Sequence, residues 1–185
     1  MSNLPSMLAR HIPFGPTRKF QRSALEPAAV QVRLLRRLLK RAHSTAYGRD
    51  LGLASVDLRG GLIESFQKTV PLQTYDDLRD RVERARKGER DVMWPGRIRD
   101  FAVSSGTASA GKIIPLSRET LKANSRFSLA AALNHFEHTG DVSMWLGKML
   151  SLPGRIEEDP SYPGTLVGEV SGFQSKYAPA FVRSL

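Results

Sequence analysis

The segment 104–112 has the composition of a loop that binds phosphate groups. Its first eight residues are all Ser, Thr, Gly or Ala, and side chains this small let backbone N–H groups turn inward around an anion. Hydroxyl groups add further donors, and the Lys at the end adds a point charge suited to a phosphate. The candidate phosphate ligands are Ser104, Ser105, Gly106, Thr107, Gly111 and Lys112. The same composition is also typical of a flexible surface loop, and composition alone does not separate the two interpretations.

Part of this loop matches the P-loop sequence pattern. Residues 106–112 satisfy the first seven positions of the pattern G-x-x-x-x-G-K-[ST], but Ile113 stands where the magnesium-binding hydroxyl would be. A P-loop also opens directly into a helix, whereas Pro115 disfavours the helical conformation at Ile114 and predicts an extended segment. The pattern therefore argues against a P-loop nucleoside triphosphatase.

The elements around the loop predict an α/β fold. Short strands are predicted at 101–103 and 112–116, on the two sides of the loop, and a third at 145–152. Helices are predicted at 75–87 and 118–138. This alternation predicts an N-terminal helical segment followed by a mixed sheet flanked by helices.

The N-terminal part of the chain is predicted to be helical and basic. Apolar residues recur at helical spacing through 28–43, with Arg and Lys at the remaining positions, and the helix is expected to end at Ala46-Tyr47-Gly48. Before it, residues 1–27 are interrupted by Pro and are expected to form a basic irregular arm with one short helix at most. Residues 28–185 are then expected to form the folded domain.

Shorter segments complete the expected secondary structure. Thr74 and Ser117 are predicted to cap the two helices that flank the sheet. Residues 66–72 are predicted to be extended, 153–163 an acidic loop rich in Pro and Gly, and 166–173 a final strand or turn.

The positive charge lies mainly in the first quarter of the chain. The net charge is +10, yet residues 1–50 alone carry +8, from 10 Lys and Arg against 2 Asp and Glu. Residues 113–185 carry equal numbers of both signs. A nucleic-acid-binding module would carry its charge on the folded body, so we expect neither nucleic acid nor a membrane as partner. The alternative, a small basic module for nucleic acid or an anionic membrane, depends on the basic helix 28–43.

Composition also bounds the class of protein. The 185 residues suffice for one domain. Without cysteine there is no disulfide framework and no thiolate metal site, and the scattered His residues predict no metal centre. The apolar runs are shorter than the roughly 18–20 residues that span a membrane. The basic N-terminus lacks the apolar stretch of a secretory signal, so a cytoplasmic location is expected.

Several short stretches follow one another in the order found in a known family. They are Thr45-Ala46-Tyr47-Gly48, Val70-Pro71-Leu72, Tyr75-Asp76-Asp77-Leu78, Gly88-Glu89, Trp94-Pro95-Gly96, Ser104-Ser105-Gly106-Thr107, Lys112 with Ile114-Pro115, Asn124, Gly147-Lys148 and Gly168-Glu169-Val170-Ser171-Gly172. Over residues 28–175 the chain resembles the N-terminal part of the auxin-responsive-promoter family of acyl-acid amido synthetases. That family is a branch of the adenylate-forming superfamily, which includes luciferase and acyl-CoA synthetases.

The resemblance implies a ligase that uses ATP and Mg²⁺. In such an enzyme a carboxylic acid is first adenylated, and an amino acid amine then displaces AMP. Both partners are small molecules. The loop 104–112 would hold the β- and γ-phosphates of ATP while pyrophosphate leaves. The residue pattern assigns no catalytic residue.

The chain departs from the family pattern in two ways that bear on nucleotide affinity. Ala108 replaces a usual Thr, and the loop is one residue shorter before Lys112. The family's later nucleotide motifs, acid-binding pocket and C-terminal domain have no counterpart here, so we expect a fragment of the large adenylating domain that is inactive alone. A sheet cut in this way leaves an open edge near 146–152 and 166–173, and self-association is therefore expected.

Overall fold

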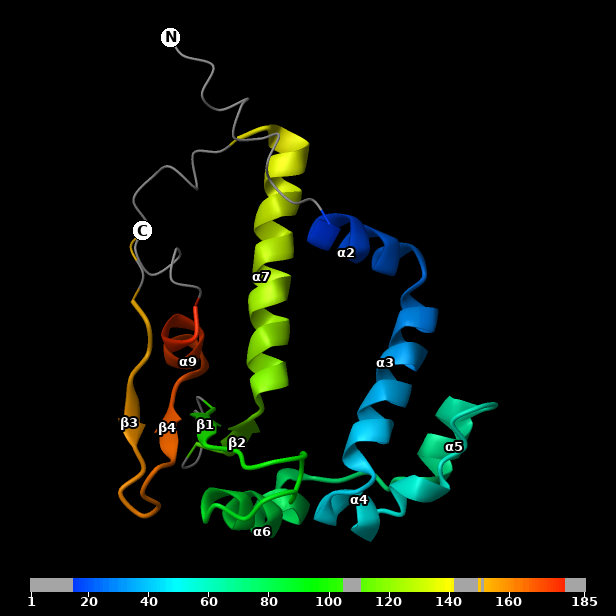
Figure 1. The fold of residues 1–185 in the computed structure, drawn as a ribbon, viewed down its shortest axis with the longest axis vertical. Coiled ribbons are helices and arrows are strands. Elements are labelled where there is room, and N and C mark those ends of the chain that lie inside the picture. The colour runs from blue at the N-terminus through cyan, green and yellow to red at the C-terminus, as the bar shows by residue number, and fades with distance from the viewer. Residues whose placement is uncertain (1–14, 105–110, 142–149, 151, 179–185) are drawn as a thin grey trace.

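The computed structural model describes residues 15–104, 111–141, 150 and 152–178. N-terminal helices, beginning with α2 (Gly15–Leu25) and α3 (Pro27–Ala42), precede a four-stranded sheet with helices on both faces. In Figure 1 the long helix α7 (Arg118–Thr139) stands between α2 and α3 on one side and α9 (Val170–Lys176) with the sheet on the other. The α/β fold predicted from the sequence is confirmed.

The described residues of the expected N-terminal arm pack against the rest of the domain. Its one expected short helix is the 11-residue α2, and this helix packs on α7. The rings of Phe20 and Phe127 meet edge to face with their centroids 5.6 Å apart, and Gln21 Nε2 donates to Asn134 Oδ1 (3.3 Å). Contacts with a distant helix thus stabilise this short helix, whose own sequence signal is weak.

The helices that follow share a small hydrophobic core. Helix α3 confirms the helix predicted at 28–43, and its buried residue Leu39 packs with Leu53, Val56 and Leu62. Leu53 begins the short 3₁₀ helix η1 (Leu53–Ser55), and Leu62 begins α5 (Leu62–Thr69). This cluster fixes the N-terminal helices relative to one another.

Two local predictions in this region were wrong. Residues 46–48 begin a new helix, α4 (Ala46–Asp50), because Thr45 Oγ1 accepts a hydrogen bond from Gly48 N (3.0 Å) and caps it. Residues 66–69, predicted to be extended, belong to α5. Phe66 lies one helical turn after Leu62, and both side chains pack in the same core.

Helix α6 (Tyr75–Arg86) lies where the sequence predicts it. Asp77 Oδ2 accepts hydrogen bonds from Thr74 N (2.7 Å) and Thr74 Oγ1 (2.8 Å) at the helix start. The bond from the backbone N–H and then the one from the hydroxyl hold the pKa of Asp77 below its usual value. Gly88, with a φ of 89°, follows the helix end in a left-handed conformation that suits glycine.

The four strands form a mixed sheet in the order β2-β1-β4-β3. The strands are β1 (Asp100–Val103), β2 (Ile113–Leu116), β3 (Ile156–Glu158) and β4 (Leu166–Gly168). β1 pairs antiparallel with β2 and parallel with β4, and β4 pairs antiparallel with β3. The two strands predicted around the candidate loop are therefore confirmed as neighbours.

Helices cover both faces of this sheet, because successive residues of a strand point to opposite sides. Phe101 is fully buried in the cluster that includes Ala85 of α6. Its neighbour Ala102 packs with Leu121 of α7 and Phe173 of α9. Helix α6 thus lies under one face of β1, while α7 and α9 lie over the other.

Predictions for the C-terminal part were only partly right. Residues 153–163 contain strand β3 as well as a loop, and residues 166–173 contain β4 and the start of α9. Most of the strand predicted at 145–152 falls outside the described residues. Its two described members, Leu150 and Leu152, lie outside any strand and are exposed.

Candidate phosphate-binding loop

The candidate loop joins two antiparallel strands. β1 ends at Val103, β2 begins at Ile113, and these two residues are register partners. A strand therefore follows Lys112, as the sequence predicts, and the helix that a P-loop would require there is absent. Of the six candidate ligands, Ser104, Gly111 and Lys112 lie in the described part. The other three, Ser105, Gly106 and Thr107, fall outside it.

The base of the loop is closed by two hydrogen bonds. Ser104 N donates to Lys112 O (2.9 Å), and Lys112 N donates to Ser104 Oγ (3.0 Å). Gly111 allows this closure, because a Cβ at its position would lie 2.5 Å from both Ser104 O and Val103 Cγ1. The structure thus brings the first and last candidate ligands together, and the lysine side chain is exposed.

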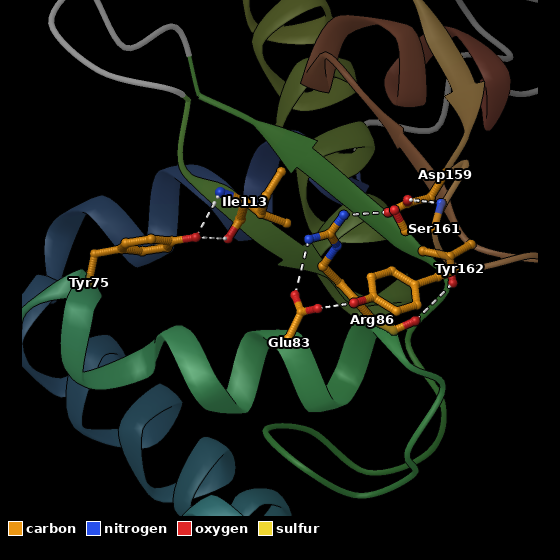
Figure 2. Close-up of polar contacts among 8 residues, drawn as sticks. Tyr75, Glu83, Arg86, Ile113, Asp159, Ser161 and Tyr162 are labelled. Carbon is orange, nitrogen blue, oxygen red and sulfur yellow. Dashed lines mark hydrogen bonds and ion pairs between the residues drawn. The ribbon is translucent and has the colours of Figure 1, made fainter.

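Tyr75, the first residue of α6, anchors the exit of the loop. Its hydroxyl donates to Ile113 O (3.2 Å) and accepts from Ile113 N (2.9 Å), as Figure 2 shows. The ammonium nitrogen of Lys112 lies 5.5 Å from the centroid of the same ring, within the range of a cation–π contact. One side chain therefore restrains both the backbone after the loop and the candidate phosphate-binding cation.

The other end of α6 is joined to the β3–β4 hairpin by an ion pair and a hydrogen bond. Arg86 Nη2 contacts Asp159 Oδ2 (2.5 Å), and Arg86 Nη1 contacts Glu83 Oε2 (3.1 Å). The Asp159 side chain is only 2% exposed and also accepts a hydrogen bond from Ser161 N (3.0 Å). Tyr162 donates to Glu83, and this bond, then burial, raises the pKa of the phenol.

These contacts give α6 two fixed points. Figure 2 shows Tyr75 reaching β2 from one end of the helix, and Arg86 reaching Asp159 from the other. A helix held at both ends cannot shift along the sheet without breaking a buried ion pair. The position of Tyr75, and with it the loop exit, is therefore set by contacts far from the loop.

Comparisons with known proteins place the chain in a family. The sequence profile of the GH3 family N-terminal domain matches residues 16–183. The chain belongs to the GH3 family. The resemblance to acyl-acid amido synthetases is thereby confirmed.

Named members of the GH3 family match over part of the chain. Indole-3-acetic acid-amido synthetase GH3.15 of Arabidopsis thaliana is 32% identical over 116 residues, covering 62% of this chain and 19% of that protein. Probable indole-3-acetic acid-amido synthetase GH3.2 of Oryza sativa subsp. japonica is 38% identical over 96 residues, covering 50% of this chain and 15% of that protein. The matched region thus spans less than a fifth of these relatives.

Solved GH3 structures have the same arrangement of elements. The GH3.15 acyl acid amido synthetase matches with a TM-score of 0.72 and 25% identity over 88% of this chain and 28% of that one. The AtGH3.15 acyl acid amido synthetase in complex with 2,4-DB matches with a TM-score of 0.59 and 27% identity, over 75% of this chain and 24% of that one. The chain therefore has the fold of one part of a GH3 large domain.

Sequence reasoning missed the role of Tyr75. Its stretch, Tyr75-Asp76-Asp77-Leu78, matches the family pattern, but the hydroxyl contacts a residue 38 positions later. The sequence did show that Tyr75 directly follows the Thr74 cap, and this position fixes where its side chain leaves the helix. Only the packing of α6 under the sheet turns that position into a contact with the loop exit.

Proposed function

We propose that this GH3 chain is the phosphate-binding part of an ATP-dependent acyl-acid amido synthetase. The observation that carries the proposal is the closed base of the loop, where Ser104 and Lys112 meet and the lysine ammonium stays exposed. Family membership supports the same conclusion, since the curated relatives are named as amido synthetases.

The proposed reaction has two steps. A carboxylate oxygen attacks the α-phosphorus of ATP and the α–β bridging P–O bond breaks, which gives an acyl-adenylate and pyrophosphate. The amine nitrogen of an amino acid then attacks the acyl carbon, forming an amide as AMP leaves with the electron pair and the amine loses a proton. Lys112 would bind the β- and γ-phosphates and stabilise the charge that develops on pyrophosphate.

Mg²⁺ fits this proposal as a companion of ATP. Among the residues that the structure describes, no three His, Asp or Glu side chains are grouped to hold a metal ion. The loop 104–112 contains no carboxylate, so the ATP oxygens themselves would bind Mg²⁺. When bound, the ion would neutralise part of the phosphate charge.

The proposal includes inactivity of the chain by itself. Adenylation also needs groups that bind adenine, orient the carboxylate and exclude water, and the matched region is only 28% of the GH3.15 chain. A cytoplasmic location is also part of the proposal, because a chain without cysteine needs no oxidising compartment.

The comparisons do not favour the alternative of a basic module for nucleic acid or a membrane. In the described part of the chain, no helix is both long and apolar enough to cross a bilayer. The basic helix α3 also uses its apolar face in the N-terminal core, through Leu39. Its cations therefore belong to a helix that packs within the GH3 fold.

The test measures nucleotide binding and turnover separately. Calorimetric titration with Mg²⁺ and ATP should show binding that Lys112→Ala weakens about 10- to 100-fold, which corresponds to roughly 1.5–3 kcal/mol for a bond to a charged group. Lys68→Ala removes the same charge from an exposed position on α5 and should leave binding unchanged. Equal binding by all three proteins would make the segment an ordinary surface loop.

A turnover assay then tests the claim that the chain is inactive alone. AMP release is measured with a panel of carboxylic acids and amino acids, and none is expected. Turnover that depends on Lys112 would refute that claim while retaining the loop assignment.

A further inference from the structure

A hollow lined by charged side chains lies at the end of the sheet opposite to the loop. This hollow of about 760 Å³ opens where β1 begins at Asp100, β4 begins at Leu166, and α7 begins at Arg118. The loop 104–112 instead follows the last residue of β1, Val103. This volume is typical of a site for a small molecule and exceeds what one phosphate ion would fill.

Cationic side chains dominate the lining of this cleft. They are Arg90, Arg97, Arg99, Arg118, Lys122 and Lys176. The lining holds three carboxylates, Asp100, Glu119 and Glu158. The cleft thus carries a net charge of about +3, although the positive charge of the whole chain lies mainly in residues 1–50.

The three carboxylates already have other partners. Asp100 is buried and accepts from Tyr177 Oη (2.9 and 3.1 Å to its two oxygens). Glu119 pairs with Arg41 of α3 (2.9 Å), and Glu158 accepts from Gly164 N (2.8 Å). None of the six cations forms an ion pair with another of the described residues.

Two further features keep the cleft positive. The N-terminus of α7, a 22-residue helix, lies at its edge, and that end of a helix carries partial positive charge. Burial, and then the bond to Asp100, raise the pKa of Tyr177, so the phenol adds no negative charge at neutral pH. All six cations are exposed to solvent, and a cleft lined by charges of one sign raises the local concentration of anions.

The geometry points to a binding site for a small molecule with two or more phosphate groups, separate from the loop 104–112. Four of the six cations are arginines, whose planar forks bind phosphate oxygens in pairs. The size of the cleft calls for several anionic groups, and the spread of cations over the segment before β1, α7 and α9 suits a chain of phosphates. This inference does not depend on the proposed ligase activity.

The test uses inorganic tripolyphosphate as the probe and the whole chain as the protein. Calorimetry at about 0.15 M salt should show binding, and the affinity of the cleft should fall at least about tenfold in the double variant Arg99→Gln/Arg118→Gln. Arg33→Gln/Arg37→Gln removes the same charge from exposed positions on α3 and should change affinity less than about twofold. Lys112→Ala should also leave this site intact.

Other calorimetric results would contradict the proposal or move the binding site to the loop. Equal weakening by both double variants would refute the proposal, because it would show diffuse attraction to a basic protein. Loss of binding in Lys112→Ala alone would assign the probe to the loop. ATP titrated in parallel separates the two sources of phosphate. If ATP binds as tightly as tripolyphosphate and loses as much affinity in the cleft variant, the ligand is a nucleotide. If ATP binds more weakly than tripolyphosphate, the ligand is an inorganic phosphate chain.

A further variant guards against a folding artefact. Should Arg99→Gln/Arg118→Gln lose its helical circular dichroism, Arg99→Lys/Arg118→Lys keeps the charge and removes the forks. Its affinity should fall several-fold below that of the unmodified chain. Unchanged affinity in this folded variant would overturn the role of the arginine forks.

Discussion

Gly111→Ala is expected to open the base of the loop. The added Cβ would lie 2.5 Å from Ser104 O and from Val103 Cγ1, whereas non-bonded carbon atoms rest about 3.5–4.0 Å apart. One arm of the loop must therefore move by about 1 Å. That movement would stretch the bonds Ser104 N to Lys112 O and Lys112 N to Ser104 Oγ beyond useful hydrogen-bond length.

The size of the effect follows from these contacts. Two hydrogen bonds are worth about 1 kcal/mol each, and overpacking typically costs about 1–3 kcal/mol. Replacing Gly by Ala also lowers the entropy of the unfolded chain, which stabilises by roughly 0.4–1 kcal/mol. We therefore expect a net destabilisation of roughly 2–5 kcal/mol for Gly111→Ala. Gly60→Ala is the matched control, because the nearest atom to its Cβ would be 3.8 Å away.

Urea unfolding and amide hydrogen exchange measure this prediction. Gly111→Ala should lower the urea midpoint and speed exchange of the Ser104 and Lys112 amides at least about tenfold. Gly60→Ala should leave both amides unchanged and be neutral or slightly stabilising. Unchanged exchange at Ser104 and Lys112 in Gly111→Ala would show that the base is not closed as the structure describes.

Two further predictions concern the contacts that hold the sheet. Asp159→Ala should lower the free energy of unfolding in urea by about 2–4 kcal/mol, because it leaves the partly buried Arg86 without its closest partner. Glu83→Ala removes the more exposed partner of Arg86 and should lower it clearly less. Equal losses in the two variants would contradict the buried ion pair. The folded-state pKa of Tyr177 is raised above the ordinary 10.0 by burial and by Asp100, so its contribution to stability is present below about pH 10 and is lost as pH rises through the folded-state pKa. The stability gap between the unmodified chain and Tyr177→Phe should therefore be constant below about pH 10 and narrow as the pH rises above it. A gap that stays constant at high pH would exclude this linkage.

Local signals in the sequence predicted most elements around the candidate site. Helix α6 begins after Thr74, and α7 begins after Ser117, whose hydroxyl accepts from Thr120 N (3.0 Å). Caps of this kind act within one helical turn, so they can be read from adjacent residues. Pro115 likewise predicted the extended strand after the loop, because its effect on Ile114 is local.

Contacts with distant elements decided the structure where the local signals were weak or misleading. The extended piece predicted at 66–72 is helical through Thr69 because Phe66 packs with Leu39 and Leu62. Helix α2 is likewise held by its contacts with α7. In both cases burial against a distant element outweighs a local preference worth only a few tenths of a kcal/mol per residue.

The arrangement of both candidate sites was decided by tertiary structure. Tyr75 meets Ile113 across 38 residues, and Arg86 meets Asp159 across 73. The basic cleft gathers Arg99 from the segment before β1, Arg118 from α7 and Lys176 from α9. The sequence by itself determined the loop, its flanking strands and the family, because those signals lie between neighbouring residues. Which side chains meet across the sheet depends on the parallel pairing of β1 with β4 and on the helices over its two faces, and no local pattern encodes that choice.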